Sequence, residues 1–366
     1  MTEGSGELQF EADGMRIIML IDMDYFYVAC EELRNSEVRD RPTIVGSDPK
    51  GGNGRGVVMT CNYKAREFGI RSGMPISIAF RIKPDALYLP LDYDFYESIS
   101  KRIMEVIRGF SRKFEQVSVD EAFIDASDVV SGYDDALTYA RKMQDDILNK
   151  TGIKCSVGIG PNKLIAKMAC EKAKPNGIKA VKESEVRQFL SEARIDDLYG
   201  IGAKTVERLK KLGYDTVDGL ANANSMEMVA EFGALGTEIK GYANGIDNRE
   251  VTENYEVKSI GREFTFEKDT DSAQEIEGAL KKLAAEVMKE VDKSNIAFKT
   301  ITIKLRYYDF AEHLHTRSVK STRNPEMLSG TAIELYRDNA ERKKKIRKIG
   351  VRVSNLTSYK GQRRIG

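Results

Sequence analysis

The sequence predicts an α+β protein of several domains, and three observations predict it. Residues 16–181 alternate apolar, strand-like runs with amphipathic helical stretches, an order that is typical of helices packed around one mixed sheet. Residues 182–245 contain mostly short helices, and the region from residue 256 onward has the order β-α-β-β-α-β, the split βαβ arrangement. A chain of 366 residues is also too long for a single small core.

The first region begins with a buried strand that runs into a helix, "RIIMLIDMDYFYVACEEL", residues 16–33. A small insertion follows at 34–92. Its extended run "RPTIVGSDPKGGNGRGVVMTCN" lacks the GxxxxGK[ST] order of a phosphate loop, which favours a hairpin. Residues 93–181 then supply an amphipathic helix, the hairpin "FEQVSVDEAFIDAS", a second helix, and the strand–turn–helix–strand sequence "IKCSVGIGPNKLIAKMACEKAKPNGIKAV".

The last region follows a charged linker and contains two helices and four strands. The predicted helices are "SAQEIEGALKKLAAEVMKEVDK" and "PEMLSGTAIELYRDNAERKK". The predicted strands are "KSIGREFTFE", "FKTITIKLRYYD", "HTRSVKS" and "IRKIGVRVSNL".

The composition is that of a soluble globular protein, with 41% hydrophobic and 31% charged residues. No apolar run approaches the roughly 20 residues that span a bilayer. The N-terminus "MTEGSGELQFEADG" is acidic and polar, unlike a secretory signal, so residues 1–15 are expected to form a loose extension, with Met15 as a second candidate start. These features predict no membrane association and a cytoplasmic location.

Cysteine and histidine usage gives little support for a zinc or disulfide framework. The four cysteines are widely spaced and include no CxxC pair, so they are expected to be reduced thiols. His313 and His315 could share one face of a strand, but an ordinary exposed strand is the favoured interpretation over a metal site.

The net charge of +1 hides an asymmetry along the chain. From residue 256 onward there are 24 Lys and Arg against 16 Asp and Glu, a net charge of +8, and the remainder has 34 against 41, a net charge of −7. A basic C-terminal module on an acidic body indicates a polyanionic partner for the module and cation sites in the body. Uneven surface charge without function is the alternative.

Asp22, Asp120 and Glu121 are the strongest candidates for a catalytic site. Asp22 follows the apolar run "IIMLI", and the two other acids stand side by side in a strand-like stretch. Buried carboxylates are costly unless they are paired or bound to metal, and three together repel each other unless cations neutralise them. If the sheet brings them to one edge, Mg²⁺ is the fitting ion, and two such ions could promote an in-line phosphoryl displacement. The alternative is that each acid lies in a solvated turn.

Three further side chains suit a triphosphate. Tyr63 and Arg66 are three residues apart, so they share a helix face, and Lys174 lies at a helix end before a Pro-Asn-Gly stop. Cations directed at phosphate oxygens supply both position and charge relief. Each residue taken alone is more often a solvated surface residue.

Two segments suit a nucleic-acid backbone. In "LYGIGAKTVERLKKLGY", Gly200, Gly202 and Lys204 belong to a helix-hairpin-helix pattern, whose glycines allow a DNA or RNA backbone to approach the N–H groups of a helix start. The alternative is a tight turn used only for packing. The run "ERKKKIRKIGVRV" adds a row of positive charges that would contact the phosphates of a nucleic acid. A nuclear-import signal and a solvated helix end are the alternatives. Its candidate contacts are Lys343, Lys344, Lys345, Arg347 and Lys348.

Five segments together resemble the motifs of the Y-family translesion DNA polymerases, in particular the archaeal members of the polymerase IV/kappa branch. These segments are "IDMDYFYVACEE", "CNYKAREFGIRSGMP", "QVSVDEAFIDAS", "SVGIGPNKLIAKMACEKAKPNG" and "IRKIGVRVSNL". The resemblance implies a right-hand polymerase with a ferredoxin-like palm, small fingers and a helical thumb, followed by a little-finger domain. The implied ranges are 1–15 for the extension, 16–33 and 93–181 for the palm, 34–92 for the fingers, 182–247 for the thumb, 248–255 for a linker, 256–356 for the little finger and 357–366 for a tail.

The resemblance also implies roles for individual residues. Asp22, Asp120 and Glu121 would bind the metal ions, assisted by the carbonyl of Met23. Tyr63, Arg66 and Lys174 would hold the incoming triphosphate with the backbone of Tyr25. Tyr27 would be the steric gate that excludes a ribose 2′-hydroxyl, although a core aromatic is the alternative. Asp24 would make local hydrogen bonds and bind no metal.

The implied activity is template-directed addition of dNTPs to a primer 3′-hydroxyl with two Mg²⁺ ions, or with Mn²⁺ as a substitute. Low fidelity, lesion bypass and no proofreading are expected from the small fingers and the absence of an exonuclease motif. Primer–template DNA and dNTPs are the expected partners of a monomer associated with the nucleoid. A sliding clamp is a further candidate, but the end "SYKGQRRIG" contains no recognisable clamp peptide. A nucleotide cyclase and a catalytically inactive DNA-binding homologue are the rival interpretations.

Overall fold

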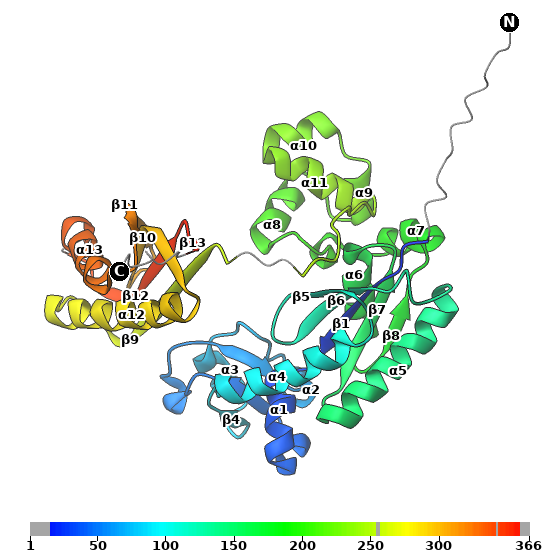
Figure 1. Ribbon diagram of the computed structural model, residues 1–366, viewed down its shortest axis with the longest axis horizontal. Coiled ribbons are helices and arrows are strands. Elements are labelled where there is room, and N and C mark those ends of the chain that lie inside the picture. The colour runs from blue at the N-terminus through cyan, green and yellow to red at the C-terminus, as the bar shows by residue number, and fades with distance from the viewer. Residues whose placement is uncertain (1–14, 254–256, 342, 359–366) are drawn as a thin grey trace, which may run out of the picture. The chain divides into compact units, whose positions relative to one another are not determined.

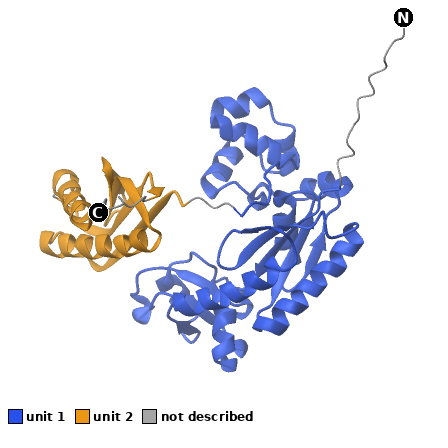
Figure 2. Cartoon of the chain, in the orientation of Figure 1, with its two compact units in different colours: residues 1–254 blue, residues 255–366 orange. Residues whose placement is uncertain are grey.

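The computed structural model describes residues 15–253, 257–341 and 343–358, and the chain divides into two compact units, residues 1–254 and 255–366 (Figure 2). Most of the predicted extension (1–15) and most of the predicted tail (357–366) lie outside the described residues. None of the helices in the described ranges has the length and apolar character needed to cross a membrane.

A five-stranded mixed sheet forms the centre of the first unit, in the order β5-β6-β1-β7-β8 (Figure 1). β1 is antiparallel to both of its neighbours, whereas β7 and β8 are parallel. The strands are β1 (Ile18–Met23), β5 (Lys113–Gln116), β6 (Glu121–Asp125), β7 (Cys155–Gly160) and β8 (Ile178–Ala180). The hairpin predicted around the two adjacent acids is therefore present as β5 and β6.

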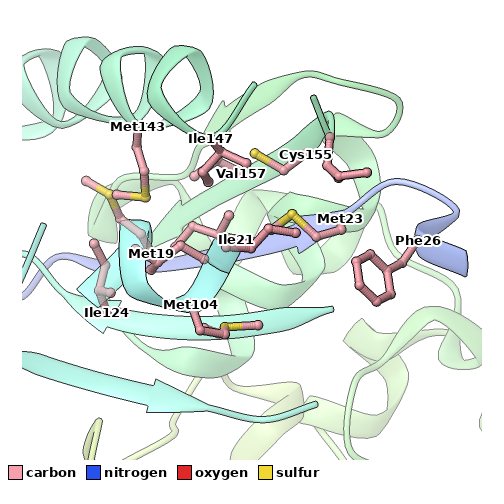
Figure 3. Close-up of a cluster of buried hydrophobic side chains, with 14 of the residues drawn as sticks. Met19, Ile21, Met23, Phe26, Met104, Ile124, Met143, Ile147, Cys155 and Val157 are labelled. Atoms are coloured by element: carbon pink, nitrogen blue, oxygen red, sulfur yellow. The ribbon is translucent and has the colours of Figure 1, made fainter. Parts of the chain in front are cut away.

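Helices cover both faces of this sheet, so that every residue of β1 is buried. Met19 and Ile21 face the core formed with α4 (Tyr93–Arg108) and α5 (Tyr133–Thr151), as Figure 3 shows. Ile18 and Leu20 point to the opposite face, against α6 (Lys163–Ala173). Because neighbouring strand residues alternate between faces, Asp22 lies on the α6 side of the sheet.

The close approach of α6 to β7 depends on glycine. A Cβ atom placed on Gly158 would lie 2.0 Å from the carbonyl oxygen of Ala166 and 2.3 Å from the backbone nitrogen of Cys170. Gly160 meets α6 in the same way. Asn162 begins the helix by accepting a hydrogen bond from the N–H of Ile165. The position of α6 over the sheet therefore follows from small residues in β7.

A smaller three-stranded sheet, ordered β3-β2-β4, occupies the insertion at 34–92. Its β2 and β3 are antiparallel, so the predicted hairpin is confirmed. α1 (Phe26–Arg34) precedes the insertion. The elements of the insertion are η1 (Ser36–Asp40), β2 (Thr43–Gly46), η2 (Lys50–Gly52), β3 (Val58–Cys61), α2 (Tyr63–Glu67), α3 (Ile76–Ile82) and β4 (Leu87–Leu89).

Short helices follow the sheet, as the sequence predicts. They are η3 (Glu183–Glu185), α7 (Val186–Ser191), η4 (Ile195–Asp197), α8 (Ala203–Lys211), α9 (Val217–Ala221), α10 (Ser225–Phe232) and α11 (Ala234–Ala243). Their apolar side chains share one cluster with Leu164, Ile165 and Met168 of α6. The same helix therefore packs on the sheet and on the short helices.

The segment after α11 does not leave the first unit at once. Asp247 is buried and accepts a hydrogen bond from the N–H of Leu164, and Val251 is buried against Ile18 and Leu20. An ion pair between Arg108 and Glu253 holds the end of the segment. Val251 of the predicted linker at 248–255 is thus packed against the sheet, and the last residues of the linker lie outside the described ranges.

The second unit has the predicted order β-α-β-β-α-β, with a sheet ordered β11-β10-β12-β9. Its elements are β9 (Ser259–Thr270), α12 (Ala273–Lys293), β10 (Ile296–Tyr307), β11 (Glu312–Thr322), α13 (Pro325–Asn339), β12 (Ile346–Ser354) and β13 (Thr357–Ser358). Two details differ from the sequence prediction. α13 ends at Asn339 because Ala340 is extended, so Glu341, Lys343 and Lys344 are not helical as predicted, and β13 is an additional short strand beside β10. The α+β prediction is confirmed in both units.

Candidate active site

Asp22 and Glu121 are a direct cross-strand pair. They occupy opposite positions in the antiparallel ladder of β1 and β6, so both side chains project from the α6 face of the sheet. Both are shielded, with side-chain exposures of 8% and 16%. Two acids that are 99 positions apart in the sequence are therefore brought together by strand register.

Asp120 joins them from the turn that precedes β6. Its carbonyl oxygen accepts a hydrogen bond from the N–H of Met23 at 2.9 Å, which fixes the turn against the end of β1. Its carboxylate accepts a 2.5 Å hydrogen bond from the hydroxyl of Ser118. Burial raises the pKa of Asp120 above its usual value, and the negative charge of Asp22 adds to the rise. Burial also raises the pKa of Glu121, and the negative charges of Asp22 and Asp120 add to that rise, whereas Lys167 opposes it.

Lys167 of α6 lies against this group and was missed by the sequence analysis. Its Nζ is 3.1 Å from Oδ2 of Asp22 and 2.5 Å from Oε2 of Glu121. Burial alone would lower the pKa of the ammonium, but the charges of Asp22 and Glu121 outweigh burial and raise it. The sequence shows only the spacing of Lys163, Lys167 and Glu171 along one helix face, a pattern that is equally typical of a solvated ion pair.

The donors present suit a hard divalent cation. Carboxylate oxygens are the ligands that Mg²⁺ prefers, and the ammonium of Lys167 shows that the pair of Asp22 and Glu121 attracts positive charge. Lys167 now lies between Asp22 and Glu121. In the described part of the chain, no group of three Asp, Glu, His or Cys side chains has the arrangement of a metal site. The side chain of Met23 is buried in the opposite core, so only its backbone could contribute a ligand.

Asp24 is a hub of hydrogen bonds. Its carboxylate accepts from the hydroxyl of Ser156 at 2.9 Å, from the N–H of Asn176 at 2.7 Å and from the hydroxyl of Tyr63 at 3.4 Å. Burial raises its pKa, although the bonds from Ser156 and Asn176 oppose that rise. The interpretation of Asp24 as a residue with local hydrogen bonds fits this arrangement.

The candidate triphosphate residues belong to two places in the first unit: Tyr63 and Arg66 lie on α2, and Lys174 follows α6. The ring of Tyr63 packs edge-on against Tyr25, with 5.3 Å between ring centroids, and burial raises the pKa of Tyr63 to about 12. The guanidinium of Arg66 lies over the ring of Tyr63 at 4.9 Å, and its Nε donates to the carbonyl oxygen of Cys61. Both residues lie on α2, as predicted.

Lys174 and Tyr25 complete this set. Lys174 follows the last residue of α6, and its Nζ is 3.0 Å from Oδ2 of Asp22 and 2.8 Å from Oε1 of Glu171. Tyr25 has φ 38° and ψ 48°, a left-handed conformation that is uncommon outside glycine. Such strained backbone is frequent at functional sites.

Tyr27 is half-buried in an aromatic group at the start of α1. Its ring stacks on Tyr96 with 4.7 Å between centroids and meets Tyr93 edge-on at 6.5 Å. Burial raises the pKa of Tyr27 above its usual value, and the charge of Asp120 adds to that rise. The packing of this residue is therefore observed, and its role as a steric gate stays a prediction.

The glycine loop before α8 lies beside α6. A cavity of about 720 Å³ is lined by Lys167, Glu171 and Lys172 on one side and by residues 196–202 on the other. Gly200 has φ 95°, and a Cβ there would lie 2.9 Å from the ring of Tyr242, whereas Gly202 faces open space and caps α8. Lys204 is exposed in the first turn of that helix. The predicted loop therefore lines the same cavity as Lys167, which contacts Asp22 and Glu121.

The basic run of the second unit is partly neutralised within the unit. Lys344 pairs with Asp309 and Glu341, and Lys348 pairs with Glu263. The run crosses the turn after α13 and enters β12. The remaining predicted contacts are Arg347, whose guanidinium lies over the ring of Phe310, and the exposed lysines Lys343 and Lys345.

Other basic residues project from the helix-free face of the same sheet. Residues of β10 and β12 that alternate with the buried ones include Lys304, Arg306 and Arg352. They were missed because their strands alternate basic and apolar residues, a pattern that gives no contiguous run. His313 and His315 lie on the other face of β11, and the Nε2 of His313 is 3.7 Å from Glu341.

Comparisons with known proteins agree with this geometry. The impB/mucB/samB family model matches residues 21–171, and the model of the family's C-terminal domain matches residues 257–365. The chain is 41% identical to DNA polymerase IV 2 of Methanosarcina mazei, over 93% of this chain and 92% of that protein. It is also 41% identical to DNA polymerase IV of Methanoculleus marisnigri, over 94% of this chain and 95% of that protein.

Solved structures of Y-family polymerases have the same fold. A Y-family DNA polymerase chimera matches with a TM-score of 0.86 at 31% identity, covering 94% of this chain and all of the chimera. The insertion ternary complex of Dbh DNA polymerase matches with a TM-score of 0.65 at 30% identity, again over 94% and 100% of the two chains. The chain therefore belongs to the impB/mucB/samB family, the Y-family of translesion DNA polymerases, and is a DNA-directed DNA polymerase related to the proteins named DNA polymerase IV.

Proposed function

We propose that Asp22, Asp120 and Glu121 are the catalytic residues of this polymerase and form the cradle for its divalent ions. The observation that supports this proposal best is the cross-strand pairing of Asp22 with Glu121, with Asp120 held beside them by the bond from Met23. The backbone carbonyl of Met23 is the fourth proposed ligand. Membership of the family implies dependence on a divalent metal, and the oxygen donors fit Mg²⁺, with Mn²⁺ as a substitute.

The proposed reaction adds one dNTP to the 3′-hydroxyl of a primer opposite a template. Two bound metal ions would lower the pKa of that hydroxyl and offset the negative charge of the triphosphate and of the leaving pyrophosphate. The protein's own part is to hold the acids ionised, to orient the triphosphate and to exclude the wrong sugar.

Tyr63, Arg66 and Lys174 are proposed to bind the triphosphate, with the backbone of Tyr25. Asp24 supports this arrangement because it bonds to Tyr63 and to Asn176, which directly follows the cis peptide bond between Lys174 and Pro175. Lys174 now contacts Asp22 and Glu171, and phosphate oxygens would offer it partners of the same charge.

Tyr27 is proposed as the steric gate against a ribose 2′-hydroxyl. Its ring stacks on Tyr96, which supports it from one side, and the residue stands in the turn of α1 that directly follows the strand of Asp22. The fingers insertion at 34–92 is small, which leaves little protein to test the new base pair. Low fidelity, lesion bypass and synthesis without proofreading are the proposed consequences.

Primer–template DNA is proposed to contact two surfaces. Gly200, Gly202 and Lys204 would receive a backbone phosphate near the acids, because Gly202 leaves the start of α8 open. The basic run from Lys343 to Lys348, in a region of net charge +8, would track the duplex electrostatically. We propose a monomer that acts in the cytoplasm at the nucleoid, with a sliding clamp as a further partner.

Primer extension by an Asp120→Ala variant tests the proposal. The variant should bind primer–template DNA nearly normally and extend it at least about 10³-fold more slowly with Mg²⁺, because the cradle has lost an oxygen donor. Asp145→Ala, which removes an exposed acid of α5, is the matched control and should extend normally. Equal extension by Asp120→Ala would make the assignment of the cradle wrong, and formation of cyclic nucleotide from free triphosphate would favour the cyclase interpretation.

A further inference from the structure

Lys167 occupies the space between the two paired acids. Its Nζ contacts one oxygen of Asp22 and one of Glu121, and only 14% of its side chain is exposed. The two contacts come from different strands, whereas the lysine comes from a helix that packs on the sheet. Lys167 is therefore a tertiary contact at the centre of the site.

The ammonium and a divalent ion would compete for the same oxygens. Mg²⁺ binds carboxylate oxygens at about 2.1 Å and requires their lone pairs. The Nζ of Lys167 lies 3.1 Å from Oδ2 of Asp22 and 2.5 Å from Oε2 of Glu121, so it uses one oxygen of each carboxylate. A divalent ion bound to the same two carboxylates would repel the ammonium, and this repulsion favours the loss of its contacts with both acids.

Without a cation, the cradle would be unstable. The side chains of Asp22 and Glu121 are only 8% and 16% exposed, and the two residues lie opposite each other on paired strands. Placing like charges together in a shielded site costs free energy unless a positive group is present. Lys167 supplies a positive group to both Asp22 and Glu121, whereas Lys174 contacts Asp22 but not Glu121.

Lys167 also has a second partner at hand. Oε1 of Glu171, one turn further along α6, is 3.5 Å from the same Nζ and is 52% exposed. Both side chains line the cavity of about 720 Å³ beside the glycine loop, so a lysine that turns toward Glu171 meets open space. The move needs side-chain rotation only.

We propose that Lys167 is a positioning residue that acts as the resident cation of the cradle. It holds Asp22 and Glu121 in place while no divalent ion is bound, and it turns to Glu171 when one binds. This inference rests on the proposed role of the acids as metal ligands.

A titration of the full chain with Mn²⁺ tests the inference. The electron paramagnetic resonance signal of free Mn²⁺ disappears as the ion binds, so its loss measures binding. Lys167→Met removes the competing charge and keeps the length of the side chain. It should bind Mn²⁺ about tenfold more tightly than the unchanged protein, and its melting temperature without metal should be lower and should be restored by Mn²⁺. Lys167→Arg keeps the charge and should stay within about threefold of the unchanged protein. Lys172→Met, an exposed lysine of the same helix, should leave Mn²⁺ binding unchanged.

Equal or weaker Mn²⁺ binding by Lys167→Met would overturn the inference and leave the proposed metal ligands intact. If the unchanged protein and Asp120→Ala bind Mn²⁺ equally well, the assignment of the metal ligands is wrong.

A second measurement uses the unchanged protein and so avoids any folding defect of the variants. The rate at which Lys167 is acetylated, measured by mass spectrometry, should rise at least about twofold when Mg²⁺ is added, because the ion takes the carboxylates that now pair with Lys167. A constant or slower rate, with Lys172 as the internal reference, would contradict the proposed movement.

Discussion

Asp22 and Glu121 lie directly opposite each other on two antiparallel strands, and their carboxylates share the ammonium of Lys167. This relationship joins three separate stretches of the sequence in one site. It depends on the register of β1 with β6, because a shift of one residue would send one of the acids to the opposite core. The fold thus places the chemistry by strand pairing and by the close approach of α6.

Gly158→Ala should destabilise the first unit strongly. Its Cβ would lie 2.0 Å from the carbonyl oxygen of Ala166, so α6 would have to move away from the sheet. We expect a loss of about 3 kcal/mol in the free energy of unfolding, measured by denaturant titration.

Gly241→Ala is the matched control for that substitution. Gly241 lies in α11, where a Cβ would meet only the carbonyl oxygen of Ile246 at 3.8 Å, so alanine should be neutral or stabilising by up to about 1 kcal/mol. Equal effects of the two substitutions would contradict the account of how α6 is positioned.

Asp247→Asn should cost stability in a pH-dependent way. Burial would raise the pKa of Asp247, but hydrogen bonds from Arg249 and from the N–H of Leu164 lower it below its usual value. Because the pKa of Asp247 is lower in the folded than in the unfolded state, its carboxylate stabilises the fold at pH values above the unfolded-state pKa of about 3.9. This contribution is lost as the pH falls through the folded-state pKa. The variant should therefore be less stable by about 2 kcal/mol at pH 7, and the difference should narrow below about pH 4.

Stability measured by denaturant titration at several pH values checks this prediction. Asp145→Asn, at an exposed position of α5, should show little change at any pH. A difference for Asp247→Asn that stays constant from pH 7 to pH 3 would show that its charge is irrelevant.

Tyr27→Ala should relax the choice of sugar. Without the ring that stacks on Tyr96, a ribose 2′-hydroxyl would meet open space, and incorporation of ribonucleotides relative to deoxynucleotides should rise by at least about tenfold. Tyr27→Phe keeps the ring and should retain the selectivity. Single-nucleotide insertion with matched dNTP and rNTP measures both variants, and unchanged selectivity in Tyr27→Ala would leave the residue a packing role only.

Lys343 and Lys345 should contribute more to DNA binding than Lys344. Both are exposed, and no described acid forms an ion pair with them, whereas Lys344 is already paired with Asp309 and Glu341. Replacing both exposed lysines by Ala should reduce the slope of log affinity against log salt concentration by about 2, if each contacts one phosphate. Lys344→Ala alone should change the slope less, and the reverse order would show that the exposed lysines do not face DNA.

Much of the fold could be predicted from the sequence because its elements have clear periodicity. The apolar run before Asp22 and the paired acids of the β5–β6 hairpin indicated one site from chemistry alone, since unpaired carboxylates beside buried strands are costly. The short helices and the split βαβ order were likewise visible as alternating patterns.

Lys167 and Asp247 could not be predicted, for a physical reason. A lysine spaced by four from a glutamate on a helix is ordinarily a solvated ion pair, and only the packing of α6 on Gly158 turns that face toward the acids. Asp247 stands in a polar stretch that has the composition of a linker, and its burial depends on contacts with α6. Both residues owe their roles to tertiary packing, which local patterns do not encode.

Anomalous diffraction from a crystal with primer–template DNA, a non-hydrolysable dNTP and Mn²⁺ tests the central claim most directly. We predict two Mn²⁺ peaks bound by oxygens of Asp22, Asp120 and Glu121, with Nζ of Lys167 next to Glu171. A ternary complex whose Mn²⁺ peaks lie elsewhere, with Lys167 still between Asp22 and Glu121, would contradict the account.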